Sequence, residues 1–206
     1  MKRSKSSAKW LDRHFNDEYV KKARQLGLRS RAVFKLMEID EKYNLFSANQ
    51  RVVDLGSAPG GWSEYVVKKI GKSGVIVATD ILPMDKILGV KFVQGDFSCN
   101  ETLDKLTNLI DNSRFDVVLS DMAPNMSGVK AIDQPKSEFL NELALDFAIK
   151  TLKKDGNFIC KTFAGAGFES FYRTLKNEFI SVRTFKPKSS RSHSAESFIL
   201  AFNKKI

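Results

Sequence analysis

Residues 51–61 read RVVDLGSAPGG, an apolar run that closes on an acidic residue and then turns through a glycine-rich loop. A short apolar run before glycine is typical of a buried strand. Glycine lets the backbone approach a ligand closely, and the N-terminus of the helix that follows offers free N–H groups. The stretch therefore predicts a strand–loop–helix unit that holds a ligand. It is not the G-x-G-x-x-G dinucleotide fingerprint, because Ser57 and Ala58 interrupt the glycines. A plain tight turn is the alternative reading of the loop alone.

Six further apolar runs follow, and helix-length segments separate most of them. We expect strands at 75–80, 91–96, 115–121, 157–161, 181–185 and 196–202, and helices at 62–71, 101–111, 136–153 and 167–178. Strands that alternate with helices predict an α/β fold with a mostly parallel seven-stranded sheet and helices on both faces. The loop at about 186–194 is shorter than a parallel crossover, so the last strand is expected to run antiparallel.

The first fifty residues differ in character from the rest. Residues 18–46 predict two helical segments broken at Gly27, and Ser30 is expected to cap the second. We therefore divide the chain into a basic N-terminal helical extension, 1–50, and one compact domain, 51–206.

Composition narrows the class of protein. The chain has 206 residues, 42% of them hydrophobic, which is enough for a core of its own. Cys99 and Cys160 form no C-x-x-C pair, which argues against a disulfide framework and a zinc site. No apolar run approaches the length of a membrane span, and none follows the basic start as in a signal peptide. We expect a monomer in the cytoplasm, with neither a metal nor a membrane partner.

The positive charge is concentrated near the start of the chain. Residues 1–35 hold eleven Lys or Arg against three acids, so eight of the ten net positive charges fall there. A second basic stretch runs from Arg183 to Arg191 and contains no acid. Such clusters favour binding of a polyanion, because Lys and Arg that contact its phosphates release the counterions condensed on it. A solvated basic face is the alternative.

Ionisable residues recur at the strand ends. In open α/β sheets ligands bind beyond the carboxyl ends of the strands. The predicted parallel strands end in Asp54, Asp80, Asp96, Asp121 and Lys161, and the antiparallel strand begins at the same edge with Glu196. Asp is also common where a strand turns into a loop, but six such residues together predict a functional site. Asp80 suits the ribose hydroxyls of an adenosine.

These residues carry a resemblance to a known family. The stretch from Asp54 to Gly61 resembles motif I of the class I S-adenosylmethionine methyltransferases, which have a Rossmann-like fold. Residues 120–125, SDMAPN, and 27–36, GLRSRAVFKL, resemble the FtsJ/RrmJ group of RNA ribose 2′-O-methyltransferases. The resemblance makes 51–206 the methyltransferase domain. It implies a catalytic tetrad, which maps onto Lys35, Asp121, Lys161 and Glu196. It also implies that S-adenosylmethionine is bound by Gly60, Trp62, Asp80, Asp96 and Asp121, to which the motif adds Asp54 and Gly56. Ser57 stands where an alanine is expected.

The resemblance further implies the reaction. The enzyme would methylate the 2′-hydroxyl of a uridine in the A loop of 23S rRNA, acting on the assembled 50S subunit, with Lys161 as proton acceptor. An ordinary lysine, with a pKa of about 10.4, is protonated at neutral pH. Burial or a neighbouring cation such as Lys35 favours the neutral amine, whereas Asp121 and Glu196 favour the charged form. The sequence leaves the balance open.

Three rival functions stay open at this point. A nicotinamide oxidoreductase could use a similar sheet, although the dinucleotide fingerprint is missing. A non-catalytic ribosome-assembly factor could keep the cofactor pocket as a relic. The same 2′-O-methylation could act on tRNA or an mRNA cap. If the partner is ribosomal RNA, the basic N-terminal segment, with Arg29 and Arg31, and the stretch Arg183–Arg191 are the expected contacts.

Overall fold

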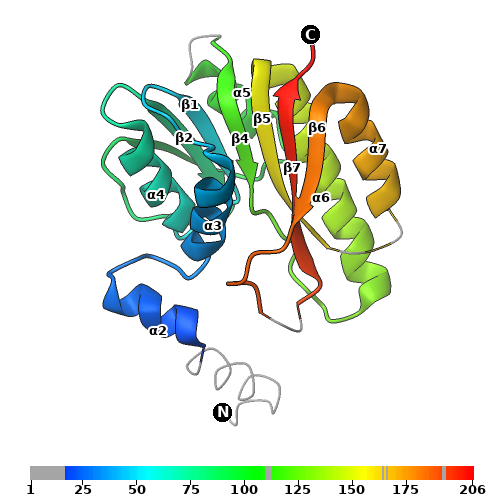
Figure 1. Cartoon of the computed structure of the whole chain (residues 1–206), viewed down its shortest axis with the longest axis horizontal. Coiled ribbons are helices and arrows are strands. Elements are labelled where there is room, and N and C mark those ends of the chain that lie inside the picture. Colours follow the sequence, from blue (N-terminus) through cyan, green and yellow to red (C-terminus); the bar gives the residue numbers. More distant parts are fainter. Residues whose placement is uncertain (1–16, 110–112, 164, 166, 192–193) are drawn as a thin grey trace.

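The structure is a computed structural model that describes residues 17–109, 113–163, 165, 167–191 and 194–206. Figure 1 shows its elements in chain order. They are α2 (Glu18–Gln25), α3 (Val33–Tyr43), β1 (Arg51–Leu55), α4 (Gly61–Ile70), β2 (Val75–Asp80), β3 (Val90–Gln94), α5 (Asn100–Asn108), β4 (Phe115–Ser120), α6 (Lys130–Thr151), β5 (Leu152–Phe163), α7 (Phe168–Glu178), β6 (Phe179–Phe185) and β7 (Glu196–Lys204).

One sheet of seven strands organises the fold, in the order β3-β2-β1-β4-β5-β7-β6. The strands from β3 to β5 pair in parallel, whereas β7 lies between β5 and β6 and is antiparallel to both. The predicted α/β class, the seven strands and the antiparallel last strand are confirmed. The strand order reverses beside β1, and the loop that leaves β1 therefore opens at the switch point where such sheets bind ligands.

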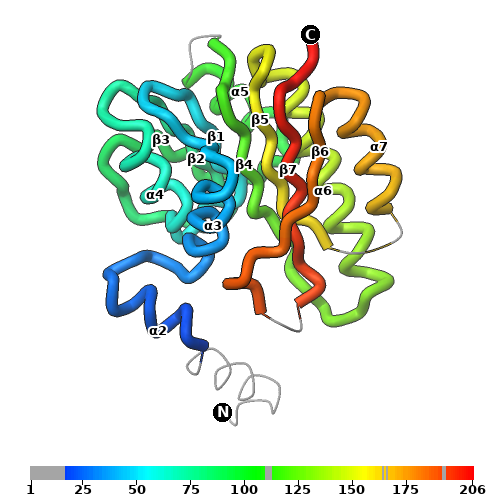
Figure 2. The backbone as a smooth tube through the Cα atoms, in the orientation of Figure 1, coloured from blue at the N-terminus to red at the C-terminus, as the bar shows by residue number. Residues whose placement is uncertain are grey.

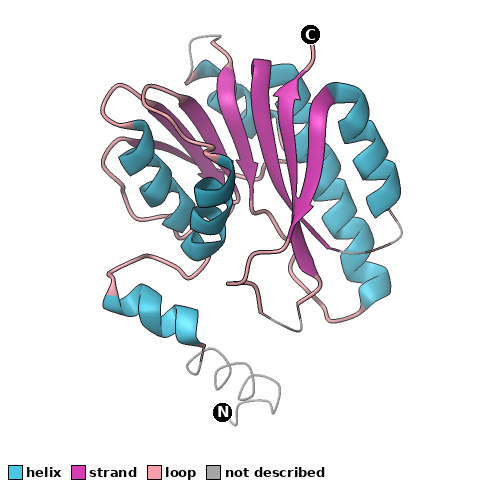
Figure 3. Cartoon of the chain, viewed as in Figure 1, coloured by secondary structure: helices cyan, strands magenta, loops and turns pink. Residues whose placement is uncertain are grey.

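Helices cover both faces of the sheet, as Figure 3 shows. The side chains of a strand alternate between the two faces, so neighbouring residues enter different cores. Val53 packs in a core with α5, α6 and α7, whereas Val52 packs in a second core with α3 and α4. The near-continuous apolar runs of the sequence reflect this burial on both sides.

Several predicted boundaries moved in the structure. The helix predicted at 136–153 begins earlier, at Lys130, so Pro135 lies inside the helix, where it removes one backbone hydrogen bond. β5 begins at Leu152, before the predicted residue 157. The prediction that Ser30 caps α3 is wrong: Ala32 is the N-cap, and no side chain bonds the free N–H groups there. β3 ends at Gln94, so Asp96 lies on the following loop.

Of the two N-terminal helices, α2 lies beyond one end of the sheet and α3 lies against its face (Figure 2). The Asp17 carboxylate caps α2, accepting the N–H groups of Tyr19 and Val20 at 3.0 and 3.3 Å. A small apolar cluster joins α2 to α3, and α3 buries Leu36 and Ile39 in the sheet core. The division of the chain at residue 50 stays a prediction, and the basic residues at 1–16 lie outside the described residues. Within the described ranges, no helix has the length and apolar character to cross a membrane.

Candidate active site

The glycine-rich loop after β1 is shaped by one close approach. Gly56 has a φ of +77°, and its N–H donates to the Thr79 carbonyl of β2 at 2.9 Å. A β-carbon at Gly56 would lie 2.8 Å from the backbone nitrogen of Met122, after β4. Only glycine fits this position without strain. The loop and the segment after β4 are thereby held against each other.

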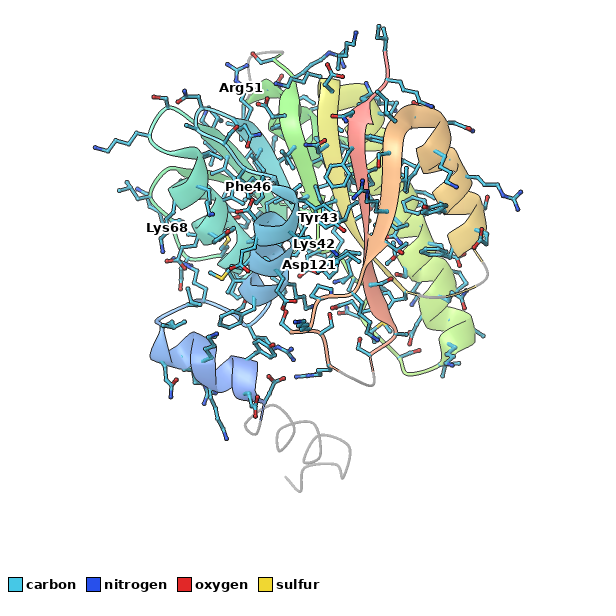
Figure 4. All side chains as sticks on the ribbon, viewed as in Figure 1. Lys42, Tyr43, Phe46, Arg51, Lys68 and Asp121 are labelled. Carbon is cyan, nitrogen blue, oxygen red and sulfur yellow. The ribbon has the colours of Figure 1, made fainter. Side chains whose placement is uncertain are left out.

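A cleft of about 530 Å³ opens beside this contact, at the carboxyl edge of the parallel strands. Its size falls in the range of small-molecule sites. Four predicted cofactor residues line the cleft: Gly56, Asp80, Asp96 and Asp121. Figure 4 shows Asp121 at this edge of the sheet and Arg51, at the start of β1, at the opposite edge. Thr79, Phe97, Met122 and Leu140 line it as well, and sequence reasoning missed them.

The carboxylates of the cleft are held by local hydrogen bonds. Asp80 accepts the N–H of Ala58 through one oxygen and the N–H of Leu82 through the other, each at 2.8 Å. Asp96 accepts the N–H and hydroxyl of Ser98, which lowers the pKa of its carboxyl. Both aspartates are therefore fixed in place and present negative charge to the cleft.

The predicted catalytic residues form two ion pairs. Lys161, on β5 and 7% exposed, lies with its Nζ 3.1 Å from the Asp121 carboxylate and donates to the Asp121 carbonyl. Lys35, on α3, lies with its Nζ 2.7 Å from each carboxylate oxygen of Glu196. Glu196 also accepts from the Ser190 hydroxyl at 3.0 Å. Four residues distant in sequence thus meet as two pairs at one edge.

Phe198, which sequence reasoning missed, connects the two pairs. It is opposite Lys161 in the β5–β7 register, where facing side chains share one side of the sheet. Its ring centroid lies 5.8 Å from the Lys35 Nζ. Glu196 is two residues earlier on the same strand and points to the same side. The Phe198 ring therefore lies next to Lys35 and on the same side of the sheet as Lys161 and Glu196.

The comparisons with known proteins decide the family. The model of the FtsJ-like methyltransferase family matches residues 28–204. A protein of Francisella tularensis, named ribosomal RNA large subunit methyltransferase E, is 52% identical over 201 residues, 98% of each chain. Its namesake in Marinobacter nauticus is 51% identical over 98% of this chain and 97% of its own. The chain belongs to the FtsJ-like methyltransferase family.

Solved structures agree with this membership. A crystal structure described as a ribosomal RNA methyltransferase of Plasmodium falciparum has a TM-score of 0.76 and 30% identity, covering 85% of this chain and 98% of that one. A structure described as an rRNA methylase of Clostridium thermocellum has a TM-score of 0.57 at 16% identity over 83% of this chain and 97% of that one, a likeness that concerns the fold alone. Both matches support the Rossmann-like architecture of the FtsJ-like family.

Two predicted cofactor residues of this FtsJ-like chain stand apart from the cleft. The Trp62 indole is buried against the Phe198 ring, and its N–H donates to the Ala32 carbonyl at 2.8 Å. Its side chain is thus part of the core, and Gly60, the N-cap of α4, does not line the cleft either. The Gly60 N–H already donates to the Ser57 carbonyl at 2.7 Å, and the Gly60 carbonyl accepts the N–H of Glu64 at 2.9 Å. For the predicted role of Trp62 its backbone N–H remains, because a helix leaves its first N–H groups without a partner inside the helix.

Asp54 also lies behind the cleft. It is fully buried; the Ser63 hydroxyl donates to one carboxylate oxygen at 2.6 Å, and no described residue donates a hydrogen bond to the other oxygen. Burial, with further repulsion from Asp121 and Asp80, raises the pKa of Asp54 to about 7. Elsewhere in the described chain, no three His, Cys, Asp or Glu side chains gather as a metal site.

The arginines expected at the RNA surface have different environments. Arg29 donates to the carbonyls of Pro59, Asp85 and Lys86 at 3.1–3.3 Å, which ties it to the cofactor-side loops. Arg31 and Arg191 instead share Asp17, close to the Lys35–Glu196 pair. The sequence did not indicate that Asp17 pairs with these two arginines; it indicated only that Asp17 is suited to cap a helix.

Proposed function

We propose that this chain transfers a methyl group from S-adenosylmethionine to the ribose 2′-hydroxyl of a uridine in the A loop of 23S rRNA, acting on the assembled 50S subunit. The observation that carries the proposal is the Lys161–Asp121 pair at the mouth of the cleft, beside the Lys35–Glu196 pair. The names of relatives that are 51–52% identical support the substrate. We further propose that the protein acts in the cytoplasm, where assembled large subunits are found, and that it acts as a monomer.

The cleft fits the proposed cofactor. It has carboxylates for ribose hydroxyls and an adenine amino group, and the space at Gly56 admits a ligand close to the backbone. The Thr79 hydroxyl lines it and has no hydrogen-bond partner among the described residues. Bound S-adenosylmethionine would supply an electrophilic methyl group on a positively charged sulfur. We assign Asp80, Asp96, Asp121 and Gly56 to direct contact and Trp62 to contact through its backbone N–H. We assign Gly60 to the turn that leads into α4, where its N–H donates to the Ser57 carbonyl, and Asp54 to support behind the site.

The four tetrad residues have separate tasks in this proposal. A ribose hydroxyl becomes a good nucleophile only as its proton leaves, and Lys161 Nζ receives that proton in its neutral amine form, so a charged Lys161 must first release its own proton to solvent. Asp121 fixes the direction of the amine through its carboxylate and its carbonyl. Lys35 and Glu196 hold each other across the acceptor side, and the buried Phe198 ring between the pairs excludes water. Positioning of the acceptor contributes as much as proton transfer, or more.

RNA would approach over the basic surface beside the tetrad. The contacts proposed are the described cations of the N-terminal segment and the stretch Arg183–Arg191. Their charge is the support, since phosphate contacts by Lys and Arg supply most of the non-specific affinity for RNA. The hydrogen bonds of Arg29 to three carbonyls give it a structural task that competes with any contact to RNA.

The test is methyl transfer from labelled S-adenosylmethionine to three acceptors: undermethylated large subunits, naked rRNA and bulk tRNA. Lys161→Ala is the active-site variant, and Lys154→Ala, at an exposed position of the same strand, is the matched control. We expect label at a uridine 2′-oxygen of the large subunit, a fall of about 10²-fold or more for Lys161→Ala, and none for Lys154→Ala. Label in tRNA alone would overturn the substrate. Intact cofactor binding without transfer to any acceptor would indicate an assembly factor instead.

A further inference from the structure

A second cavity adjoins the tetrad on the side away from the cofactor cleft. It has a volume of about 220 Å³ and is lined by Arg31, Ala32, Lys35, Arg191, Ser194 and Glu196. Two of these residues, Lys35 and Glu196, belong to the proposed tetrad. A ligand bound in this cavity would therefore be separated from the acceptor ribose by no more than one side chain.

The two arginines of this cavity are held by Asp17. Arg31 donates one terminal nitrogen to the Asp17 carboxylate and the other to the Ser189 carbonyl. Arg191 donates its Nε to the same Asp17 oxygen at 3.3 Å. Asp17 is only 8% exposed and is fixed by its cap on α2. Both guanidiniums therefore have set orientations before any ligand arrives.

Arg31 and Arg191 differ in which guanidinium nitrogens remain available to a ligand. Arg31 has both terminal nitrogens engaged, and its Nε is buried without a partner. The pKa of Arg31 is lowered, mainly by burial of its guanidinium. The charge of Arg191 also lowers this pKa, and the nearby Asp17 carboxylate partly opposes the shift. The side chain of Arg191 is 32% exposed, and no described residue accepts a hydrogen bond from its two terminal nitrogens. Arg191 is thus the arginine with a free, oriented pair of donors.

The loop that carries Arg191 is itself anchored to α3. The Glu38 carboxylate accepts the N–H groups of Lys188 and Ser189 at 2.6 and 2.8 Å. Lys35 reaches Glu196, just beyond the loop, from the same face of the helix. The position of Arg191 is therefore determined by α2 through Asp17 and by α3 through Glu38.

We propose that Arg191 binds the phosphodiester of the RNA backbone beside the acceptor ribose, and that Asp17 and Arg31 are the residues that position its guanidinium. The inference rests on the proposed function and assigns one contact of it. A planar guanidinium with two free terminal nitrogens matches the geometry of a phosphate. The cations around the cavity, Arg31, Lys35 and Arg191, outnumber the carboxylates Asp17 and Glu196 by one. In RNA the 2′-oxygen and the 3′-phosphate are on adjacent ribose carbons, so a phosphate must lie close to any group that is methylated there.

The test compares Arg191→Gln, which removes the charge but leaves a shorter polar side chain, with Arg191→Lys, which keeps the charge. Arg173→Ala removes an exposed arginine of α7 and is the matched control. Methyl transfer to undermethylated large subunits is measured at several salt concentrations, with equilibrium binding of the same subunits alongside. Binding of S-adenosylmethionine and the melting temperature verify that each variant is folded.

We expect Arg191→Gln to raise the KM for subunits by about 10- to 100-fold, the range for a lost charge-assisted hydrogen bond, with little change in kcat. The log–log salt slope should become shallower by about one. Arg191→Lys should keep the slope and have an intermediate KM, and Arg173→Ala should match the wild type. A KM and slope for Arg191→Gln equal to those of Arg173→Ala would overturn the proposal, as would a fall in kcat alone. If the wild type methylates no subunit, the proposed function fails, but the salt slope of binding still tests the Arg191 contact.

Discussion

Asp54 gives the sharpest prediction about stability. This carboxyl is fully buried behind the cleft, with one oxygen bonded to Ser63 and the other without a hydrogen-bond donor among the described residues. Its pKa is raised from 3.8 to about 7. The folded state therefore holds a proton that the unfolded chain releases near pH 4. The stabilisation from this proton is complete below pH 3.8 and is lost as the pH rises toward 7.

The size of the effect follows from linkage. Each pH unit in which the folded chain binds one more proton changes the free energy of unfolding by about 1.4 kcal/mol. Between pH 5 and pH 8 the loss is about 3 kcal/mol, since the folded group ionises near pH 7. Asp54→Asn removes the titration but keeps an acceptor for Ser63. The stability of Asp54→Asn relative to wild type should thus improve by about 3 kcal/mol over this interval.

The assay is thermal unfolding of the cofactor-free protein from pH 5 to pH 8. A change of 3 kcal/mol corresponds to roughly 6–12 °C in melting temperature for a domain of this size. Asp104→Asn, at an exposed position on α5, is the control and should show a constant difference from wild type. Only the pH dependence is used, so any fixed cost of the buried amide cancels. A difference between Asp54→Asn and wild type that stays constant with pH would refute the reasoning.

Three further predictions concern the site. Gly56→Ala places a β-carbon against Met122 at a positive φ, so the free energy of unfolding should fall by about 1–3 kcal/mol. Binding of S-adenosylmethionine should weaken as well, and a binding titration that matches wild type would contradict this. Glu196→Gln leaves the Lys35 ammonium without its counter-ion, and denaturant unfolding should show a loss of about 1–3 kcal/mol together with a lower kcat. Asp133, on α6, accepts the N–H groups of Ser127 and Gly128. Asp133→Asn should therefore raise the KM for the cofactor and speed amide hydrogen exchange at residues 122–129. Unchanged exchange at these residues would contradict the prediction.

Local patterns were sufficient to predict the elements of the sheet. Short apolar runs, the first four of which end in Asp, predicted all seven strands, because strands buried on both faces need continuous apolar residues. The short loop at 186–194 was enough to predict the direction of β7. Boundaries were less accurate where a tertiary contact outweighs local preference. α6 begins before Pro135, and α3 begins after Ser30 with no side-chain cap.

The sequence predicted the edge of the sheet at which Asp121, Lys161 and Glu196 lie, but it did not predict several of the contacts there. Charged residues at strand ends indicated the edge, and the family resemblance supplied Lys35, which lies on a helix remote from that pattern. The sequence could not show that the Trp62 ring belongs to the core, since an aromatic residue after a glycine loop suits either place. Phe198 was also missed, because its proximity to Lys35 depends on the register of β7 and the packing of α3. Such contacts are properties of the assembled fold.

The position of β7 between β5 and β6 has a consequence for how the protein is made. A ribosome synthesises β6 before β7, so a nascent chain that ends at β6 presents two strands whose common neighbour does not yet exist. Such a chain also lacks Glu196, which must find Lys35 across a separation of 161 residues. Closure of the sheet and completion of the tetrad are therefore one late event in biogenesis. On the proposed role of Glu196, an enzyme that acts on ribosomes would gain its activity only after β7 has been synthesised.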